Sequence, residues 1–112
     1  SFNQTVGPRT SEAGYQSAAI FSGKKVIQGI GGGICQTAST IYNVVLEAGL
    51  SVVERHPHTL KVAYVAPGRD ATVAWGSADF KFRNTNNFPV KILCTVQDEY
   101  VVVALVKETP AP

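Results

Sequence analysis

The sequence predicts an α+β domain: one principal helix, over about residues 36–48, packed on a mostly antiparallel sheet formed largely by residues 50–107. Three observations lead to this prediction. Apolar residues recur at helical spacing in one segment, short β-rich runs separated by turn residues fill the second half, and 112 residues are enough for one domain but not two. We therefore expect a single domain over residues 1–108, with residues 109–112 as a frayed tail or linker.

The composition excludes several classes of protein. Hydrophobic residues make up 45% of the chain and charged residues 16%, which excludes a disordered chain. The net charge of +2 gives no electrostatic footprint for nucleic acid. The chain contains no Met. We therefore expect it to be part of a longer protein, in which any membrane contact runs through segments absent from this chain.

The first 23 residues are rich in turn formers, and no regular element is expected there. A short strand over about residues 24–28 precedes a glycine-rich stretch. The helix follows, with Gly49 as its stop signal. Its buried face is expected to carry the residues at i, i+3, i+4 and i+7 spacing, namely Ala38, Ile41, Tyr42, Val45 and Leu46.

Beyond the helix, the sequence predicts strands over residues 51–55, 60–65, 71–75 and 78–83. Alternating apolar residues over 90–96, a turn at Gln97-Asp98 and a further β-rich run over 100–107 predict a hairpin with one buried face. Cys94 alternates in phase with Val90, Ile92 and Val96, so we expect it to pack in the core.

The first candidate for chemistry is Cys35, at the start of the predicted helix. Unpaired N–H groups and the helix dipole at such a position favour a thiolate and lower its pKa. A thiolate attacks carbonyl carbons, and nearby amides can hold the resulting oxyanion. The surrounding Gly31, Gly32, Gly33 and Gln36 are candidate substrate-binding residues. The alternative is a small buried residue after a tight turn, and the local sequence leaves both open.

The second candidate is the stretch 54–58, which holds both histidines of the chain. His56 or His58 is a candidate general base for the thiol, since imidazole accepts protons near neutral pH. Asp70 or Asp79 is a candidate acid that orients the imidazole. The alternatives are an exposed polar loop for the histidines and turn chemistry or a surface ion pair for Asp70.

A zinc site is a minority alternative. His56, His58 and Cys35 could ligate zinc together with Asp70 or Asp79. Zinc sites usually show more closely spaced ligand pairs than one His-x-His and a distant Cys, so we expect no metal and no other cofactor.

Four stretches of the sequence resemble the VanW family, which is named for an accessory protein of B-type vancomycin resistance. They are residues 1–10, then GIGGGICQTASTIYN, then GLSVVERHPHTL, then GRDATVAWGSADFKFRN. The resemblance implies a cell-envelope protein of a Gram-positive bacterium, placed outside the cytoplasm in the wall or anchored to the membrane. A fainter similarity of pattern, a Cys at a helix start followed by His and then an acid, links the chain to transglutaminase-like and papain-like thiol enzymes.

Together these observations favour a thiol enzyme that acts on an acyl or amide bond in peptidoglycan or its stem peptides. Cys35 is then the nucleophile, and Arg55, Arg69 or Arg9 binds a substrate carboxylate. The competing prediction is a non-catalytic module that binds peptidoglycan or the cell wall, in which Cys35 is structural.

Overall fold

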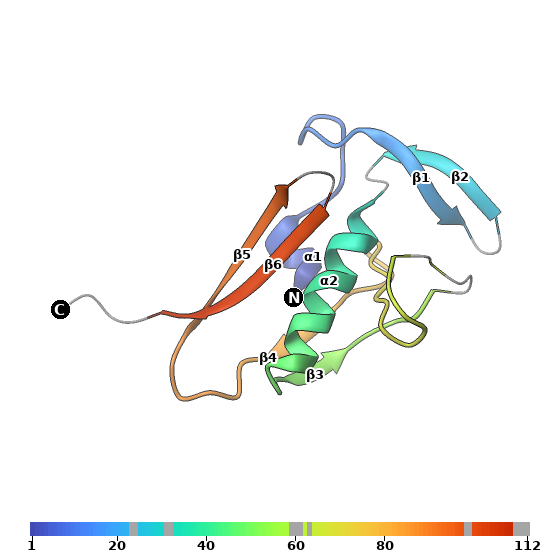
Figure 1. The fold of residues 1–112 in the computed structure, drawn as a ribbon. Helices are drawn as coiled ribbons and strands as arrows, with labels where there is room; N and C mark the ends of the chain where they lie inside the picture. The colour runs from blue at the N-terminus through green and yellow to red at the C-terminus, as the bar shows by residue number, and fades with distance from the viewer. Residues whose placement is uncertain (23–24, 31–32, 59–61, 63, 98–99, 109–112) are drawn as a thin grey trace.

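A long helix, α2 (Ile34–Glu47), lies at the centre of the computed structural model, and pairs of strands surround it (Figure 1). The structure describes residues 1–22, 25–30, 33–58, 62, 64–97 and 100–108. The predicted α+β class is confirmed. No helix in these ranges is long and apolar enough to cross a membrane. The other elements are α1 (Phe2–Val6), β1 (Ser17–Ser22), β2 (Lys25–Ile30), β3 (Ser51–Glu54), β4 (Lys81–Arg83), β5 (Val90–Gln97) and β6 (Tyr100–Lys107).

The position of α2 confirms the helix predicted from apolar spacing. It begins two residues earlier than expected because Gly33, with φ of 92°, forms the N-cap in a left-handed conformation that glycine adopts without strain. It ends at Glu47, and Gly49 follows as the expected stop signal with φ of 72°. The face predicted to be buried is buried at Ala38, Ile41, Tyr42 and Val45 and half-buried at Leu46.

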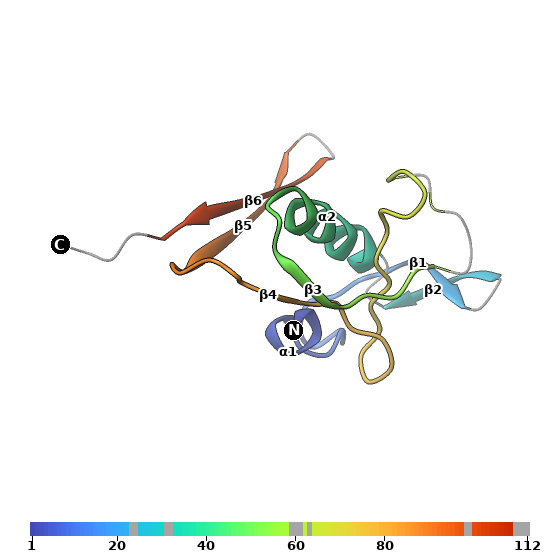
Figure 2. The same ribbon diagram turned by 90° about the horizontal axis from the view of Figure 1, so that it is seen from below.

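The strands form three two-stranded antiparallel sheets rather than the single sheet that was predicted. These are β1–β2, β3–β4 and β5–β6. Seen from below, β3–β4 and β5–β6 lie on different sides of α2 (Figure 2). Contacts with the helix, rather than shared ladder hydrogen bonds, therefore join these two sheets.

The segment between β3 and β4 contains less strand than predicted. Residues 71–75 form no strand, and the described residues of 78–83 form one only at β4, with an isolated bridge between Ala74 and Ala78. Part of the predicted strand 60–65 lies outside the described residues, and its described members Val62, Tyr64 and Val65 are not in a strand. The backbone of residues 69–73 instead bonds to side chains of α2.

The N-terminal region contains two elements that the sequence analysis missed, α1 and β1. Helix α1 has only five residues, too few to show a helical period. It is held by distant partners: the Asp79 carboxylate accepts hydrogen bonds from the Ser1 hydroxyl and the Asn3 backbone N–H, and the Phe2 N–H donates to the Phe80 carbonyl. Because these contacts join positions more than 70 residues apart, the sequence near α1 contains no pattern that predicts the helix.

The β5–β6 hairpin is confirmed, but the burial predicted for β5 is wrong. Cys94 is exposed, as are Ile92 and Val96. They lie opposite β6 residues in the regular register, so they share the face on which Val103 and Leu105 pack against the core. Helix α2 contacts β6 and covers only that half of the face, which leaves the β5 half exposed.

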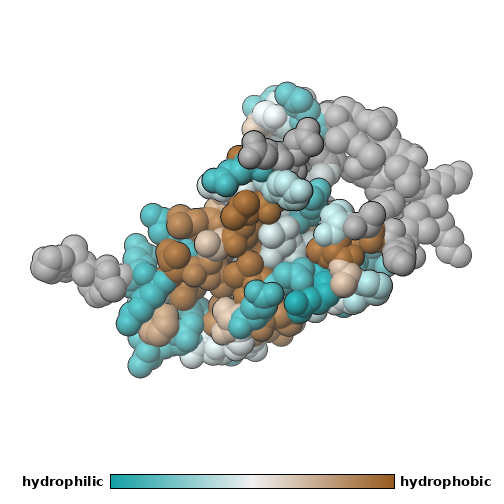
Figure 3. Space-filling model, in the orientation of Figure 1, coloured by the Kyte–Doolittle hydropathy of each residue, from teal (hydrophilic) through white to brown (hydrophobic). Residues whose placement is uncertain are grey.

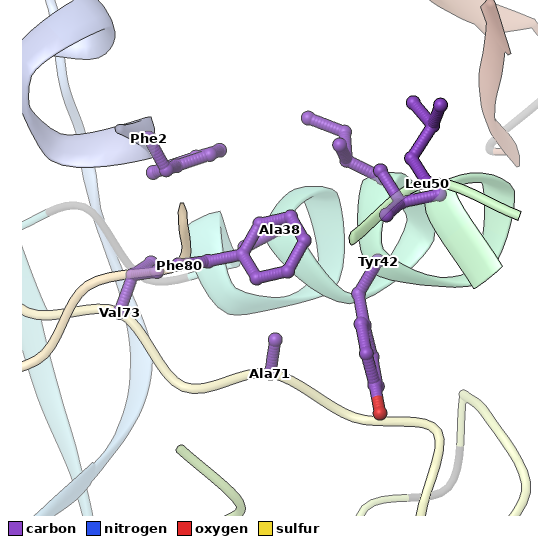
Figure 4. Packing of buried hydrophobic residues seen from close by; sticks show 9 residues of the cluster. Phe2, Ala38, Tyr42, Leu50, Ala71, Val73 and Phe80 are labelled. Atoms are coloured by element: carbon purple, nitrogen blue, oxygen red, sulfur yellow. The ribbon is translucent and has the colours of Figure 1, made fainter. Parts of the chain in front are cut away.

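The hydrophobic core lies between α1, α2 and the segment around Phe80 that leads into β4. Figure 4 shows the Phe80 ring beside Ala38, with Phe2 and Val73 around it. Phe80 is 1% exposed and contacts the edge of the Tyr42 ring, with the two ring centroids 5.6 Å apart. One aromatic side chain thus joins the N-terminal helix, the central helix and the segment that precedes β4.

We expect the substitution Phe80→Ala to lower the free energy of unfolding by about 3–5 kcal/mol, because it removes a large buried side chain and leaves a cavity. The matched control is Trp75→Ala, since Trp75 is 53% exposed and its loss should change stability by no more than about 0.5 kcal/mol. Urea denaturation of both variants measures the difference. Equal losses would contradict the position assigned to the core.

Candidate functional site

Three polar side chains of α2, spaced one turn apart, hydrogen-bond to alternate residues of the extended segment 69–73. We call this set the polar row. Four helical residues rise about 6 Å, and two extended residues advance about 6.6 Å, so the two repeats stay in step. The pairs are Cys35 with Val73, Ser39 with Ala71, and Asn43 with Arg69.

The polar row satisfies backbone groups of a segment that, among the described residues, lies in no strand. The Ser39 hydroxyl accepts from the Ala71 N–H at 2.8 Å and donates to the Ala71 carbonyl at 3.2 Å. The Asn43 amide donates to the Arg69 carbonyl at 2.8 Å. Ser39 is fully buried, so its bonds to Ala71 are shielded from water. The polar row therefore determines where the residues just after Arg69 sit.

Asp70, the residue after Arg69, holds His58. Its Oδ2 accepts hydrogen bonds from the His58 backbone N–H and from the ring Nδ1, both at 2.7 Å. The other carboxylate oxygen and the backbone carbonyl accept from Arg55, at 3.2 and 2.8 Å. The His58 side chain is 3% exposed. An ionised carboxylate can only accept a hydrogen bond, so Nδ1 of His58 carries a proton.

The ionisation of Asp70 follows from these contacts. Burial alone raises the pKa of the Asp70 carboxyl, but the hydrogen bonds from the backbone and ring of His58 outweigh it and lower the pKa below its ordinary value. The carboxylate is therefore charged at neutral pH. Of the two candidate acids, the structure brings Asp70 to an imidazole.

The thiol of Cys35 lies in an environment different from the one that its position at a helix start predicts. Its Sγ is 3.5 Å from both the backbone nitrogen and the carbonyl oxygen of Val73. Burial raises the pKa of the Cys35 thiol, and the Val73 N–H and the positive charge of Arg9 offset this only in part. The expected lowering of the pKa is not found, and the thiol is protonated at neutral pH. The charge of Asp70 also raises this pKa, by less than burial does.

The second histidine, His56, lies apart from this arrangement. Its ring is exposed, and Nε2 lies 2.9 Å from Glu54, whose pKa this hydrogen bond lowers. The Glu54 carboxylate also pairs with Lys81 at 3.4 Å. Only the backbone of His56 joins the site, because its carbonyl accepts from the Thr72 N–H at 2.7 Å. Of the two candidate bases, His58 is the buried one and the one that a candidate acid, Asp70, holds.

The remaining candidates fall into three places. Asp79 binds α1, as described above, and Arg9 donates to the Asn3 side chain and the Gly7 carbonyl while its charge still acts on Cys35. Arg69 lies at the outer end of the polar row, 3.9 Å from Glu47. Gly33 caps α2, Gln36 is half-buried in its first turn, and Gly31 and Gly32 lie outside the described residues.

Sequence reasoning missed Tyr64, Ser39 and Asn43. The edge of the Tyr64 ring contacts His58 with centroids 6.4 Å apart, and its hydroxyl hydrogen-bonds with Ser39. Burial is the main cause that raises the pKa of this phenol. The sequence does contain a pattern that indicates Ser39 and Asn43, because they follow Cys35 at i+4 and i+8 and so share its side of the helix. Tyr64 has no such signal.

Metal ligation finds no support in the described part of the chain. No group of three or more His, Cys, Asp or Glu side chains comes together there as metal ligands do. The zinc alternative would need His56 and His58 on one ion, yet the first binds Glu54 and the second Asp70.

Comparison with known proteins gives one family and two curated relatives. Residues 1–106 match the family described as VanW like protein. The uncharacterized protein YoaR of Bacillus subtilis is 54% identical over 92 residues, which are 82% of this chain and 30% of that protein. The vancomycin B-type resistance protein VanW of Enterococcus faecalis is 28% identical over 108 residues, 91% of this chain and 39% of that protein. The chain thus spans well under half of either relative, and no solved structure matches it.

We expect Ser39→Ala to lower the free energy of unfolding by about 1–3 kcal/mol, because it leaves the buried N–H and carbonyl of Ala71 without their partner. Thr40→Ala is the matched control. It removes a hydroxyl of the next residue that bonds only within the helix, to the Gln36 carbonyl. Chemical denaturation measures both, and an equal effect of the two substitutions would contradict the role of the polar row.

The lowered pKa of Asp70 predicts that the free energy of unfolding depends on pH. Its pKa is lower in the folded chain than in the unfolded chain, so its contribution is complete above about pH 4 and is lost as pH falls through the folded value. We expect Asp70→Asn to be less stable than wild type at pH 7 by about 1–3 kcal/mol. This difference in the free energy of unfolding between wild type and Asp70→Asn should be smaller at pH 3. A gap of the same size at both pH values, measured by urea denaturation, would rule this out.

Proposed function

The chain belongs to the VanW-like protein family, as the resemblance in its sequence predicted, and from this premise we propose that it is a thiol enzyme of the cell envelope. Its proposed reaction is attack on an acyl or amide bond in peptidoglycan or its stem peptides, outside the cytoplasm. One relative carries the name of a vancomycin B-type resistance protein, which is compatible with this setting.

The observation that carries the proposal is the buried His58–Asp70 pair. A carboxylate that holds Nδ1 of an imidazole fixes the ring for proton transfer at Nε2, and this is the arrangement that general-base catalysis needs. Asp70 is itself fixed by Arg55 and by the polar row. Cys35 binds the same short segment at Val73, three residues from Asp70.

The raised pKa of the thiol determines the form of the mechanism. Because the thiol is protonated in the free enzyme, His58 Nε2 takes its proton as Sγ attacks the carbonyl carbon, and the carbonyl electron pair moves to oxygen. Backbone N–H groups at the start of α2 stabilise that oxyanion. Collapse of the intermediate expels the amine, which takes the proton from His58. Water or a second amine then attacks the thioester and restores the thiol.

Two arginines have different parts in this proposal. Arg55 is committed to Asp70 and acts as its support, with its guanidinium stacked 5.1 Å from the centroid of the Tyr42 ring. Arg9 lies near enough to Cys35 to act on its charge, so it is the best placed cation for a carboxylate of a stem peptide.

A second candidate function is a non-catalytic module that binds the cell wall. The observation that favours it is the polar row itself, in which Cys35 takes the same type of position as Ser39 and Asn43 and bonds to backbone. In that function the thiol only holds segment 69–73 against α2.

The two functions lead to different expected results when purified peptidoglycan fragments are incubated with the protein and monitored by mass spectrometry. The enzyme releases or transfers a fragment, Cys35→Ser abolishes this while Ser still bonds to Val73, and His58→Ala lowers the rate by about 10²–10⁴-fold. His56→Ala is the control and should leave the rate within about twofold, since His56 lies apart on Glu54.

The outcome that would contradict the enzyme is equally direct. A wild-type protein that binds the fragments but leaves them intact, with binding unchanged in Cys35→Ser, supports the wall-binding module. Product formation that survives Cys35→Ser would also overturn the proposed nucleophile. Thermal melts of each variant show whether a loss of activity reflects a loss of folding.

A further inference from the structure

Exposed apolar side chains cover both faces of the β5–β6 hairpin. Figure 3 shows hydrophobic residues gathered over the region where the hairpin and α2 lie. On the face that β6 turns to the core, Val96 is 74% exposed and Ile92 42% exposed, although both belong to the adjoining strand β5. Contiguous apolar surface of this kind marks interaction sites more often than scattered single residues do.

The outer edge of β5 is also unprotected. In the described part of the chain β5 pairs with β6 alone, and its other edge carries no strand. The eight pairs from Val90–Lys107 to Gln97–Tyr100 run without a bulge. Proteins usually protect an edge with charges, proline or a bulge, and the only charge on β5 is Lys91. A regular, apolar edge of eight residues is suited to pairing with another strand.

We propose that this edge binds a second copy of the chain, β5 against β5 in antiparallel register with Cys94 opposite the partner's Cys94. Around Cys94 the strand is complementary to itself. Ile92 then lies opposite the second copy's Val96, and Lys91 lies opposite its Gln97, so no like charges meet. The result is a four-stranded sheet with a two-fold axis, in the order β6, β5, β5, β6.

This register also covers the apolar strip. Pairing even-numbered with even-numbered residues keeps the face that carries Val103 and Leu105 on the same side in both copies. Each α2 packs on its own β6 on that face. The two β6 strands are three strand spacings apart, about 14 Å, and a helix with side chains is about 10–12 Å wide. The paired β5 strands therefore lie between two copies of α2 rather than in open water.

Sedimentation velocity over a concentration series tests the proposal on the whole chain. Wild type should associate to a dimer, and Val96→Lys should weaken the dimer by about tenfold or more, because it places a charge against the second copy's Ile92. The matched control is Val102→Lys, which changes another exposed valine of the same hairpin on the opposite face and should leave the dimer intact. Far-ultraviolet circular dichroism checks that each variant is folded.

Disulfide trapping tests the register. In a Cys35→Ser background, mild oxidation with diamide should link two chains through Cys94, since Cα atoms of opposite residues lie about 4.5–5.5 Å apart and a disulfide spans that distance. A control with Cys94→Ser and Thr95→Cys places the two substituted positions on a diagonal, about 7–8 Å apart, and should link slowly.

Three results would overturn the proposal. The first is a wild-type chain that is monomeric at every concentration. The second is a Val102→Lys variant that weakens association as much as Val96→Lys does. The third is the absence of a Cys94 disulfide at a concentration where the dimer forms. None of these measurements depends on activity, so they are independent of the proposed reaction.

Discussion

The polar row between α2 and segment 69–73 is the interaction on which the site depends. A stretch of extended backbone that pairs with no strand over most of its length must satisfy its N–H and carbonyl groups elsewhere. Here Ser39 and Asn43 supply those partners from the side of a helix. The match between one helical turn and two extended residues makes the arrangement possible over three successive contacts. Asp70 lies inside the segment so fixed, and His58 takes its position from Asp70.

In the proposed enzyme, Cys35 has a structural role and a catalytic role that compete. As the first member of the polar row, its sulfur bonds to the backbone of Val73 and is half-buried, which raises the pKa of the thiol. If it acts as the proposed nucleophile, the same sulfur must leave Val73 and approach a substrate carbonyl. In the proposed enzyme, a thiol that is protonated in the free protein receives its activation from His58 only when substrate binds, so no reactive thiolate is present before then.

Local sequence patterns predicted the elements whose partners are near in the chain. The period of Ala38, Ile41 and Val45 predicted α2, and alternation predicted the β5–β6 hairpin. The same alternation was wrong about burial, because nothing in β5 tells how far across the sheet the helix reaches. Residues 71–75 look like a strand in composition, yet they bond to helix side chains, an interaction that strand propensity does not describe.

The candidate site divides in the same way. Residue chemistry identified Cys35, His58 and Asp70, while only the fold distinguished His58 from His56 and Asp70 from Asp79. Helical spacing indicates Ser39 and Asn43 as well, because they lie one and two turns beyond Cys35 on the same side of α2. Tyr64 reaches the site from a loop, so its place depends on tertiary structure alone.

The most direct test of the account is the capture of a covalent intermediate on Cys35. Wild-type protein is mixed with peptidoglycan fragments, quenched in acid within the first turnovers, and its intact mass and Cys35 peptide are measured by mass spectrometry. We expect an acyl group on Cys35 that forms much more slowly in His58→Ala. Turnover without an adduct on Cys35, or an adduct that forms equally fast in His58→Ala, would contradict it.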